Sequence, residues 1–350
     1  MASSALNIAV IGFGRMGRIY ARTLADRVDH ATLHAIADPA VQPDDPTVVA
    51  LDVPHVVNDP AQALQLPDLH AVVIATPTST HAEIVIAAAQ AGVAIFCEKP
   101  LALSLDATRE AVAAAEQAGV PLQVGFMRRF DPAYRQAKQA LEQGQIGRPL
   151  TFKAIGRDPG CPDPAFADPA TSGGLILDMA IHDFDLARWL MESEVERVSA
   201  TGALLACDDL QAVGDIDNAV INLHFANGAL GNVEVSRNAV YGYDVRTEVL
   251  GTDGVVHVGA AEADDADCWM RKESGSSREN YLMERFGAAY RAQIQDFVAC
   301  VRAGRLPAVT GADALAAFEL ALAATFSARL HEPVTLEAVR AGWTPDLATP

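Results

Sequence analysis

Basic residues are scarce in this sequence. Its 350 residues include 26 Lys and Arg against 45 Asp and Glu, which gives a formal net charge of −19. A surface with this excess of negative charge repels nucleic acids and anionic membranes. The composition therefore disfavours polyanionic macromolecules as partners, although a local basic pocket can still hold a small anion.

The cysteines show no pairing pattern. They are odd in number, far apart and without a C-x-x-C pair: Cys97, Cys161, Cys207, Cys268 and Cys300. Zinc sites and disulfide frameworks in small domains use closely spaced, even-numbered cysteines. We therefore expect reduced thiols, with neither a zinc site nor a disulfide framework, as is typical of a cytoplasmic protein.

Long apolar runs and an export signal are missing as well. No stretch of about 18 or more consecutive apolar residues occurs, so no membrane span is expected. Residues 1–7 contain no basic region before a long apolar run, and the apolar stretch Ile8–Ile11 ends at once in glycines. The sequence predicts a cytoplasmic chain. With 50% hydrophobic residues, it is long enough to form two domains with separate cores.

The first motif that the sequence does contain is a glycine turn. The apolar run Leu6–Ile11 leads directly into Gly12-Phe13-Gly14-Arg15-Met16-Gly17, and Arg18–Arg27 has helical composition. Strand, glycine turn and helix in this order are typical of dinucleotide-binding domains. Gly12 permits the tight turn, Gly14 lets the backbone approach a pyrophosphate, and Gly17 permits close helix packing. The phosphates are expected at the helix N-terminus.

An acidic residue ends the next expected strand, Thr32–Ala37. Asp38 lies about 20 residues beyond the last glycine, where a carboxylate can accept hydrogen bonds from both adenosine ribose hydroxyls. The 2′-phosphate of NADP would be repelled there, and we find no neighbouring Lys or Arg to offset this. Asp38 therefore predicts NAD as the cofactor. The alternative is a surface aspartate that caps the loop before Pro39.

Strand and helix patterns alternate through the first third of the chain. Further buried strands are expected at Ala71–Ala75, Val93–Cys97 and Leu122–Gly125, with helices between them. This alternation predicts a Rossmann domain with a doubly wound parallel sheet over residues 1–125, whose ligand lies beyond the carboxyl ends of the strands. The residues expected at the cofactor are Gly12, Phe13, Gly14, Arg15, Met16, Gly17, Asp38, Thr76, Pro77, Thr78, His81, Glu98 and Lys99. His81 is expected to be a helix cap or a neighbour of the cofactor, not a catalyst.

Beyond Gly125 the pattern changes. Apolar residues alternate along Ala219–Phe225, and Asn227-Gly228 predicts a hairpin turn. We expect an α+β domain over residues 126–350, with a large, mostly antiparallel open sheet and with helices on one face only. The segment 157–172 is expected to form a pocket rim, and the polar segment 260–280 to form an excursion ordered by a ligand or a neighbouring subunit.

Three polar residues recur at helical spacing in one segment. Asp178, His182 and Asp185 stand at i, i+4 and i+7, which places them on one side of a helix. Oxidation of a secondary alcohol requires a general base with a pKa near neutrality, and His182 is the natural candidate. Asp178 can orient the imidazole or anchor a hydroxyl, and Lys99 can stabilise a developing alkoxide. A metal is the alternative, but Lys99 supplies the positive charge, so we expect a metal-free reaction.

These motifs together resemble the glucose–fructose oxidoreductase/inositol dehydrogenase/rhizopine catabolism (Gfo/Idh/MocA) family over nearly the whole chain. The motifs that carry the resemblance are the glycine turn, Glu98-Lys99-Pro100, and Gly173-Gly174 followed by Asp178-x-x-x-His182. Gly125–Asp131 and Tyr241–Asp244 resemble the inositol 2-dehydrogenase branch in particular. The resemblance implies that Lys99, Asp178 and His182 form the catalytic group.

The resemblance also implies roles for residues around that group. It suggests that Arg129 and Asp185 hold substrate hydroxyls, that Tyr241 lines the pocket, and that the Lys99–Pro100 bond is cis. Other interpretations stay open. Arg129 could form an ion pair between the domains, Asp185 could pair with Arg188, and Tyr241 could pack on a sheet face. In the family the open sheet faces pack between subunits, which implies a homotetramer or a homodimer.

The sequence thus predicts an NAD-dependent dehydrogenase that oxidises a ring secondary alcohol of a cyclic polyol, myo- or scyllo-inositol, to the ketone. An aldose (pyranose) 1-dehydrogenase acting on a glucose-like sugar is one alternative. An NAD-retaining glycoside hydrolase, as occurs among relatives in the family, is an alternative of another class. A non-catalytic NAD-binding sensor would have no need of Lys99, Asp178 and His182.

Overall fold

The computed structural model describes residues 5–259 and 278–345. The chain forms two compact units, Met1–Met127 with Ala288–Leu315, and Arg128–Gly287 with Ala316–Pro350. The first boundary lies two residues beyond the position 125 expected from the sequence. The segment Ala288–Leu315, which the sequence pattern gives no reason to separate from the second half, belongs to the first unit.

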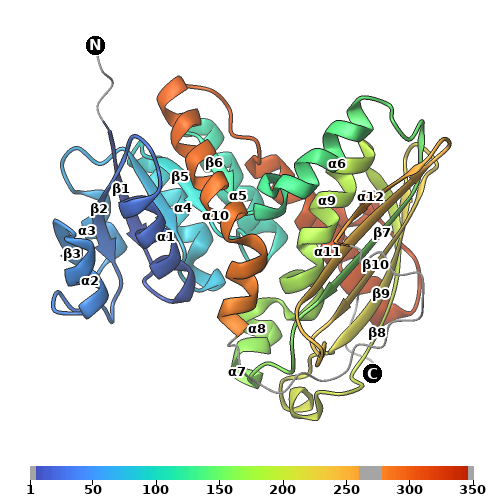
Figure 1. Cartoon of the computed structure of the whole chain (residues 1–350). Helices are drawn as coiled ribbons and strands as arrows, with labels where there is room; N and C mark the ends of the chain where they lie inside the picture. Colours follow the sequence, from blue (N-terminus) through green and yellow to red (C-terminus); the bar gives the residue numbers. More distant parts are fainter. Residues whose placement is uncertain (1–4, 260–277, 346–350) are drawn as a thin grey trace. The chain divides into compact units, whose positions relative to one another are not determined.

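The first unit is built on a parallel sheet of six strands in the order β3-β2-β1-β4-β5-β6 (Figure 1). Its strands are β1 (Leu6–Ile11), β2 (Ala31–Ala37), β3 (His55–Val57), β4 (Ala71–Ile74), β5 (Ala94–Cys97) and β6 (Leu122–Val124). Its helices are α1 (Arg15–Asp26), α2 (Pro46–Leu51), α3 (Pro60–Leu64), η1 (Thr78–Thr80), α4 (His81–Gln90) and α5 (Leu105–Ala118). The predicted doubly wound Rossmann sheet is confirmed.

Strand order and burial explain where this unit can bind a ligand. The order of strands reverses between β1 and β4, and in doubly wound sheets the crevice at such a reversal holds the ligand. The residues of β4 and β5 are buried throughout, because helices cover both faces of a parallel sheet. On α1, Ile19, Tyr20 and Leu24 are buried, whereas Arg15 and Arg22 are exposed.

The second unit is built on a seven-stranded sheet in the order β12-β11-β7-β10-β9-β8-β13. Its strands are β7 (Pro149–Arg157), β8 (Val195–Ala203), β9 (Asn218–Phe225), β10 (Leu230–Ser236), β11 (Asp244–Gly251), β12 (Val255–Val258) and β13 (Val334–Thr335). Among the described strands of this sheet, β7 and β10 alone pair in parallel, so the prediction of a mostly antiparallel sheet is confirmed. The hairpin predicted at Asn227-Gly228 joins β9 to β10, with Gly228 at a φ of +83°.

The second half also contains helices. They are α6 (Pro132–Glu142), α7 (Pro164–Ala167), α8 (Pro169–Ser172), α9 (Ile181–Met191), α11 (Gly311–Leu330) and α12 (Leu336–Arg340), with short turns η2 (Met127–Phe130), η3 (Ile176–Ala180) and η4 (Asp208–Val213). The long helix α10 (Arg278–Ala303) passes from the second unit into the first. Figure 1 shows α6, α9 and α11 against one face of the sheet, and among the described residues no helix covers the other face.

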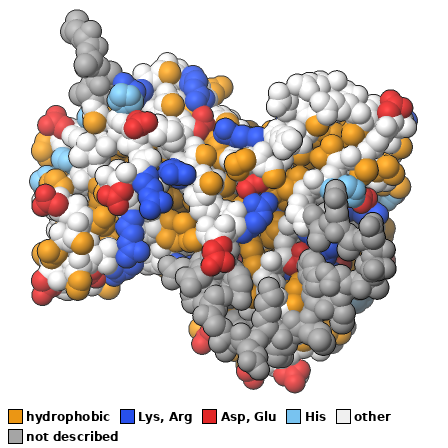
Figure 2. Space-filling view, viewed as in Figure 1, with side chains coloured by type: hydrophobic (Ala, Val, Ile, Leu, Met, Phe, Trp, Pro, Cys, Tyr) orange, Lys and Arg blue, Asp and Glu red, His pale blue; other side chains and the backbone are white. Residues whose placement is uncertain are grey.

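Side-chain alternation on β9 agrees with this one-sided arrangement. Ala219, Ile221, Leu223 and Phe225 are buried, whereas Val220 between them is 47% exposed. A strand with helices on one side only has this period of two. In Figure 2 the acidic side chains in view are spread in small groups over the surface, in keeping with a net charge that is not concentrated at one site.

The expectation of reduced thiols is wrong for two cysteines. Cys161 and Cys207 form a disulfide although 46 residues separate them in the sequence. The two residues meet because α7 and η4 pack together, a contact between distant segments that cysteine spacing does not reveal. Cys97 and Cys300 are buried free thiols. Cys268 lies outside the described residues.

Three other segments have a notable composition: the apolar helix α11, residues 157–172 and the polar residues 260–280. Helix α11 is the one helix in the described part of the chain that is long and apolar enough to cross a membrane, but 61% of that stretch is buried inside the protein. Burial of this kind is expected of a core helix. Residues 157–172 contain α7 and α8. Of the polar segment 260–280, residues 260–277 lie outside the described residues, and the remainder begins α10.

Candidate active site

Three glycines shape the turn between β1 and α1, each under a different constraint. Gly12 has a φ of +92°, and a Cβ atom there would lie 2.7 Å from the backbone of Ala75 and Thr76. A Cβ at Gly17 would lie 1.8 Å from the carbonyl oxygen of Gly12. At Gly14, whose φ is −71°, a Cβ would meet nothing within 4 Å. Packing therefore requires Gly12 and Gly17, while the open space at Gly14 fits a pyrophosphate at the start of α1.

Asp38 stands at the end of β2 with its carboxylate held by backbone amides. Its Oδ2 accepts a hydrogen bond from the amide of Phe13 at 2.7 Å, and its Oδ1 accepts one from the amide of Ala40 at 2.8 Å. A carboxylate oxygen has two lone pairs, so each can also accept a ribose hydroxyl. The side chain is thus fixed next to the glycine turn, in the position that the sequence predicts for a ribose-binding acid.

The expectation that no basic side chain lies near Asp38 is wrong. Arg18, on the first turn of α1, places its guanidinium carbon 4.3 Å from the centre of the Phe13 ring. Its hydrogen bond to Asp45 raises the pKa of Arg18, and the negative charge of Asp38 adds to that rise. The sequence hides this proximity because Arg18 and Asp38 lie on different elements that converge at the carboxyl end of β1.

Lys99 follows β5 in a turn whose other residues are buried. Between Val93 and Ala102 it is the one residue with appreciable exposure. The Lys99–Pro100 peptide bond is cis, as the resemblance implies. The turn is fastened by Glu98, whose Oε2 accepts a hydrogen bond from the Lys99 amide at 3.1 Å and whose Oε1 accepts one from the Tyr20 hydroxyl. Burial raises the pKa of Glu98, while the hydrogen bond from Tyr20 opposes that rise.

His81 connects the Lys99 turn to the loop after β4. One ring nitrogen lies 2.8 Å from the carbonyl oxygen of Pro100, and the other lies 2.9 Å from that of Thr76. The side chain is only 1% exposed, and burial lowers the pKa of His81 while the two carbonyls oppose that effect. His81 and Glu98 therefore hold in place the two loops that carry predicted cofactor residues. Direct contact of either side chain with the cofactor stays a prediction.

Asp178 and His182 are partly exposed within a stretch of helix whose other residues are buried. Every residue from Gly174 to Ala187 is buried except these two, which are partly exposed one turn apart. Asp178 lies in the π-helical turn η3, and His182 is the second residue of α9. The sequence predicts a single α-helix here, whereas η3 has the wider i to i+5 pattern that is frequent at functional sites.

A buried arginine lies behind Asp178. Arg237 directly follows β10, is 0% exposed, and places Nη2 3.6 Å from Oδ2 of Asp178 and 3.4 Å from Oδ2 of Asp215. Its Nε, Nη1 and Nη2 atoms make no hydrogen bond with any described residue. Burial raises the pKa of Asp215, whereas the charge of Arg237 and the amide of Leu175 act in the opposite direction. One guanidinium thus sits between two carboxylates.

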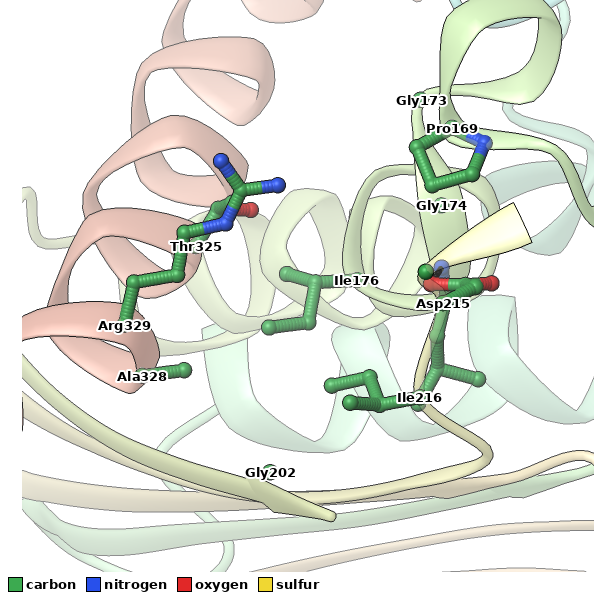
Figure 3. A pocket seen from close by; sticks show the side chains of 12 residues that line it. Pro169, Gly173, Gly174, Ile176, Gly202, Asp215, Ile216, Thr325, Ala328 and Arg329 are labelled. Atoms are coloured by element: carbon green, nitrogen blue, oxygen red, sulfur yellow. Dashed lines mark hydrogen bonds between the residues drawn. The ribbon is translucent and has the colours of Figure 1, made fainter. Parts of the chain in front are cut away.

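Asp215 also lines a cavity of about 100 Å³ beside η3. Figure 3 shows Asp215 and Ile216 on one side of this cavity and Arg329 of α11 on the other, with Ile176 between them. Neither Asp215 nor Arg237 is predicted from the sequence. Their position is the signal that could have found them, because Asp215 precedes β9, Arg237 follows β10, and the two lie at the same end of this hairpin.

Arg129 and Asp185 form a buried ion pair with each other. Nε and Nη2 of Arg129 donate to the two carboxylate oxygens of Asp185 at 2.8 and 2.6 Å. Asp185 is 1% exposed, in contrast to Asp178 and His182 on the same stretch of helix. The adjacent residues form a second pair, Arg128 with Asp183. The structure therefore brings Arg129 and Asp185 together within the second unit, and their contact with a substrate stays a prediction.

Tyr241 belongs to a polar network beyond the ends of β7 and β10. Its hydroxyl donates to Oδ2 of Asp244 at 2.7 Å and accepts from Nη1 of Arg157 at 2.8 Å. Arg157 also binds Glu234. Burial raises the pKa of Tyr241, and the hydrogen bond from Arg157 opposes that rise. The hydroxyl of Tyr241 is thus held between two charged partners, Arg157 and Asp244.

Comparisons with known proteins identify the class to which these two units belong. Residues 6–126 match the family model described as "Oxidoreductase family, NAD-binding Rossmann fold", and residues 134–257 match the "GFO/IDH/MocA C-terminal domain". The chain therefore belongs to the Gfo/Idh/MocA family of NAD-binding oxidoreductases.

Particular relatives are similar over almost the full length. The chain is 40% identical to scyllo-inositol 2-dehydrogenase (NAD(+)) of Bacillus subtilis over 95% of this chain and 97% of that protein. It is 39% identical to myo-inositol 2-dehydrogenase of Thermotoga maritima over 95% and 99%. Among solved structures, scyllo-inositol dehydrogenase of Lactobacillus casei with bound NAD(H) and scyllo-inositol matches with a TM-score of 0.86 at 30% identity, covering 95% of this chain and 100% of that one.

Proposed function

We propose that this protein is an NAD-dependent dehydrogenase that oxidises a ring secondary alcohol of a cyclic polyol, scyllo- or myo-inositol, to the ketone. The observation that carries the proposal is that Asp178 and His182, one turn apart, are the two partly exposed residues in an otherwise buried stretch of helix. Ionisable side chains that lie within a buried segment are often functional. The names of the relatives favour inositols as the substrates.

His182 acts as the general base in this proposal. The hydroxyl proton must leave as the hydrogen on the same carbon departs as a hydride, and a neutral imidazole accepts a proton near neutral pH. Asp178 accepts a hydrogen bond from the imidazole or from a neighbouring hydroxyl, and the buried guanidinium of Arg237, 3.6 Å away, holds the Asp178 carboxylate in place. Lys99 stabilises the negative charge that develops on the substrate oxygen. NAD, when bound, supplies the hydride acceptor.

Cofactor binding is assigned to the first unit, within the sequence-defined domain 1–125. The proposed contacts are the glycine turn from Gly12 to Gly17, Asp38 at the ribose, the loop with Thr76, Pro77 and Thr78, and His81, Glu98 and Lys99. The open space at Gly14 and the fixed carboxylate of Asp38 support this assignment. No metal is needed in this reaction, because Lys99 supplies the positive charge beside the oxygen.

Substrate binding and self-association are assigned to residues 126–350. Arg129, Asp185 and Tyr241 are proposed to hold the ring hydroxyls. We also propose a homotetramer, or a homodimer, in which the sheet face without helices packs against another subunit, because that face exposes Val220, Leu230 and Leu250. A cytoplasmic location stays a proposal, and the Cys161–Cys207 disulfide removes the argument from reduced thiols for it.

The test is to follow the absorbance of reduced nicotinamide while the purified protein is given NAD with scyllo-inositol, myo-inositol, glucose and other aldoses. Growth of the signal with an inositol supports the proposal. Growth with aldoses alone would replace it with the aldose 1-dehydrogenase. A flat trace from protein that retains NAD after purification, together with cleavage of a glycoside, would replace it with the hydrolase.

A further inference from the structure

A cation stands beside the proposed ribose site. Arg18 stacks over the ring of Phe13, and the amide of Phe13 donates to Asp38. Figure 2 shows Lys and Arg side chains gathered over the part of the first unit where Figure 1 draws α1, the helix that contains Arg15, Arg18 and Arg22. In Rossmann domains, an arginine next to the ribose is the group that accommodates the 2′-phosphate of NADP. Its planar fork matches the geometry of a phosphate.

Asp45 already occupies this fork. Nη1 of Arg18 lies 3.2 Å from Oδ1 of Asp45, and Nη2 lies 2.9 Å from Oδ2. The hydroxyl of Thr47 accepts a further hydrogen bond from Nη1 at 3.0 Å. The bond from Arg18 lowers the pKa of Asp45 well below its usual range, so the carboxylate is charged at every physiological pH. Both terminal nitrogens of the guanidinium are therefore bonded to Asp45, whose charge offsets that of Arg18.

Asp45 is itself fixed by a second role. It is the N-cap of α2, and its Oδ1 accepts a hydrogen bond from the amide of Thr47 at 2.8 Å, with Pro46 at the first helical position. A capping side chain has a defined rotamer, which orients the carboxylate toward Arg18. Because the cap already fixes the Asp45 side chain, only Arg18 has to be ordered for the ion pair to form.

We propose that Asp45 is a cofactor-specificity residue, which neutralises Arg18 and so withholds from NADP the cation that its 2′-phosphate would need. Asp38 and Asp45 then act together. Asp38 offers acceptors to the ribose hydroxyls and repels a phosphate, and Asp45 prevents Arg18 from compensating for that repulsion. The local charge of Asp38, Arg18 and Asp45 sums to −1, which disfavours a phosphate group that carries nearly two negative charges.

This proposal rests on the NAD-binding Rossmann domain and not on the identity of the polyol. It can be tested by cofactor binding alone, without substrate, so that a failed substrate panel would leave it intact. The informative variant is Asp45→Asn, since asparagine retains the N-cap acceptor while removing the charge. Asp59→Asn is the matched control, because Asp59 caps α3 in the same way, with Pro60 next and the amide of Ala61 at 2.8 Å.

The measurement is the dissociation constant of NADPH and of NADH, obtained from the fluorescence of the reduced nicotinamide. We expect Asp45→Asn to tighten NADPH binding by about tenfold, the equivalent of one charge-assisted contact, with NADH changed by less than about twofold. The gain should shrink as salt is added. Asp59→Asn should change neither constant.

The role of Arg18 is tested by adding Arg18→Gln to Asp45→Asn, which should abolish the gain. Because Asp38 alone could mask the effect, the series is repeated with Asp38→Asn, where Asp45→Asn should again favour NADPH. The proposal is overturned if Asp45→Asn leaves the ratio of the two constants unchanged in both backgrounds. It is equally overturned if the gain for NADPH persists without the Arg18 guanidinium.

Discussion

The guanidinium of Arg237 lies 3.6 Å from the carboxylate of Asp178, and no part of the Arg237 side chain reaches solvent. A buried cation at this distance stabilises the ionised form of the carboxylate and limits its movement. Because Asp215 shares the same guanidinium, the loss of Arg237 would leave two carboxylates facing each other next to the proposed base.

Replacement of Arg237 should therefore reduce turnover before it affects cofactor binding. We expect Arg237→Met to lower kcat by about 10²-fold and to destabilise the fold by about 3–5 kcal/mol, as removal of one partner from a buried charge cluster does. Addition of Asp215→Asn should restore part of the stability but not the turnover. Steady-state kinetics and denaturant unfolding separate the two effects. Full activity in Arg237→Met would refute a role of this charge at Asp178.

Two glycines of the motif, Gly14 and Gly17, should respond differently to the same substitution. Gly14→Ala is compatible with a φ of −71° and with the open space there, so the variant should fold normally. Its methyl group would occupy the space proposed for the pyrophosphate, and we expect NAD binding to weaken by about 10-fold or more. Gly17→Ala would place a Cβ 1.8 Å from a carbonyl oxygen and should unfold the first unit. Thermal unfolding with and without NAD measures both effects.

Asp217 provides a stability test with a defined pH dependence. Its carboxylate is 0% exposed and accepts hydrogen bonds from the amides of Leu205, Ala206 and Cys207 at 2.6–2.8 Å. Burial pushes the pKa of Asp217 upward, but these bonds outweigh burial and hold the pKa below its ordinary value of 3.8. We expect Asp217→Asn to lower the free energy of unfolding by about 2–3 kcal/mol at neutral pH.

The sign of this pH dependence follows from the lowered pKa. A carboxyl with a lower pKa in the folded than in the unfolded state stabilises the fold above its unfolded pKa, and this contribution is lost as the pH falls through the folded pKa. The difference between wild type and Asp217→Asn should therefore be constant above pH 5 or so and shrink below about pH 4. A difference that grew on acidification would contradict the assignment.

Two neighbouring aspartates allow the proposed substrate role of Asp185 to be separated from a structural one. Both Asp183 and Asp185 are buried and paired, with Arg128 and Arg129 respectively. We expect Asp183→Asn to reduce stability without changing KM for the polyol. Asp185→Asn should raise that KM by about 10-fold, the loss of one charged hydrogen bond to a hydroxyl. If the two variants have the same KM for the polyol, Asp185 has a structural role and does not bind the substrate.

Much of the fold could be predicted because local patterns determine it. The strand, glycine turn and helix at Leu6–Arg27 follow a local glycine pattern that is specific to dinucleotide-binding domains. Asn227-Gly228 favours the left-handed backbone conformation that a tight hairpin needs. The same holds for Asp178 and His182, whose spacing of one turn is visible in the sequence. These features depend on neighbours close along the chain, so the sequence displays them directly.

Most of the features that could not be predicted depend on contacts between distant segments. The Cys161–Cys207 disulfide, the approach of Arg237 to Asp178 and the Arg129–Asp185 pair each join residues at least 46 positions apart. The π-helical turn at Asp178 is a small departure from an α-helix that hydrophobic spacing does not register. Arg18 illustrates the same limit, because its neighbours Asp38 and Asp45 are close only after β1 and β2 have paired in the sheet.

The central claim, that His182 removes the hydroxyl proton, is tested most directly by single-turnover hydride transfer in His182→Ala. The variant is mixed with saturating NAD and the best polyol, and the rate of reduced nicotinamide formation is compared with wild type and with His224→Ala on the sheet. The account predicts a decrease of about 10²–10⁴-fold for His182→Ala alone, with little change in NAD affinity. Hydride transfer at the wild-type rate in His182→Ala would contradict it.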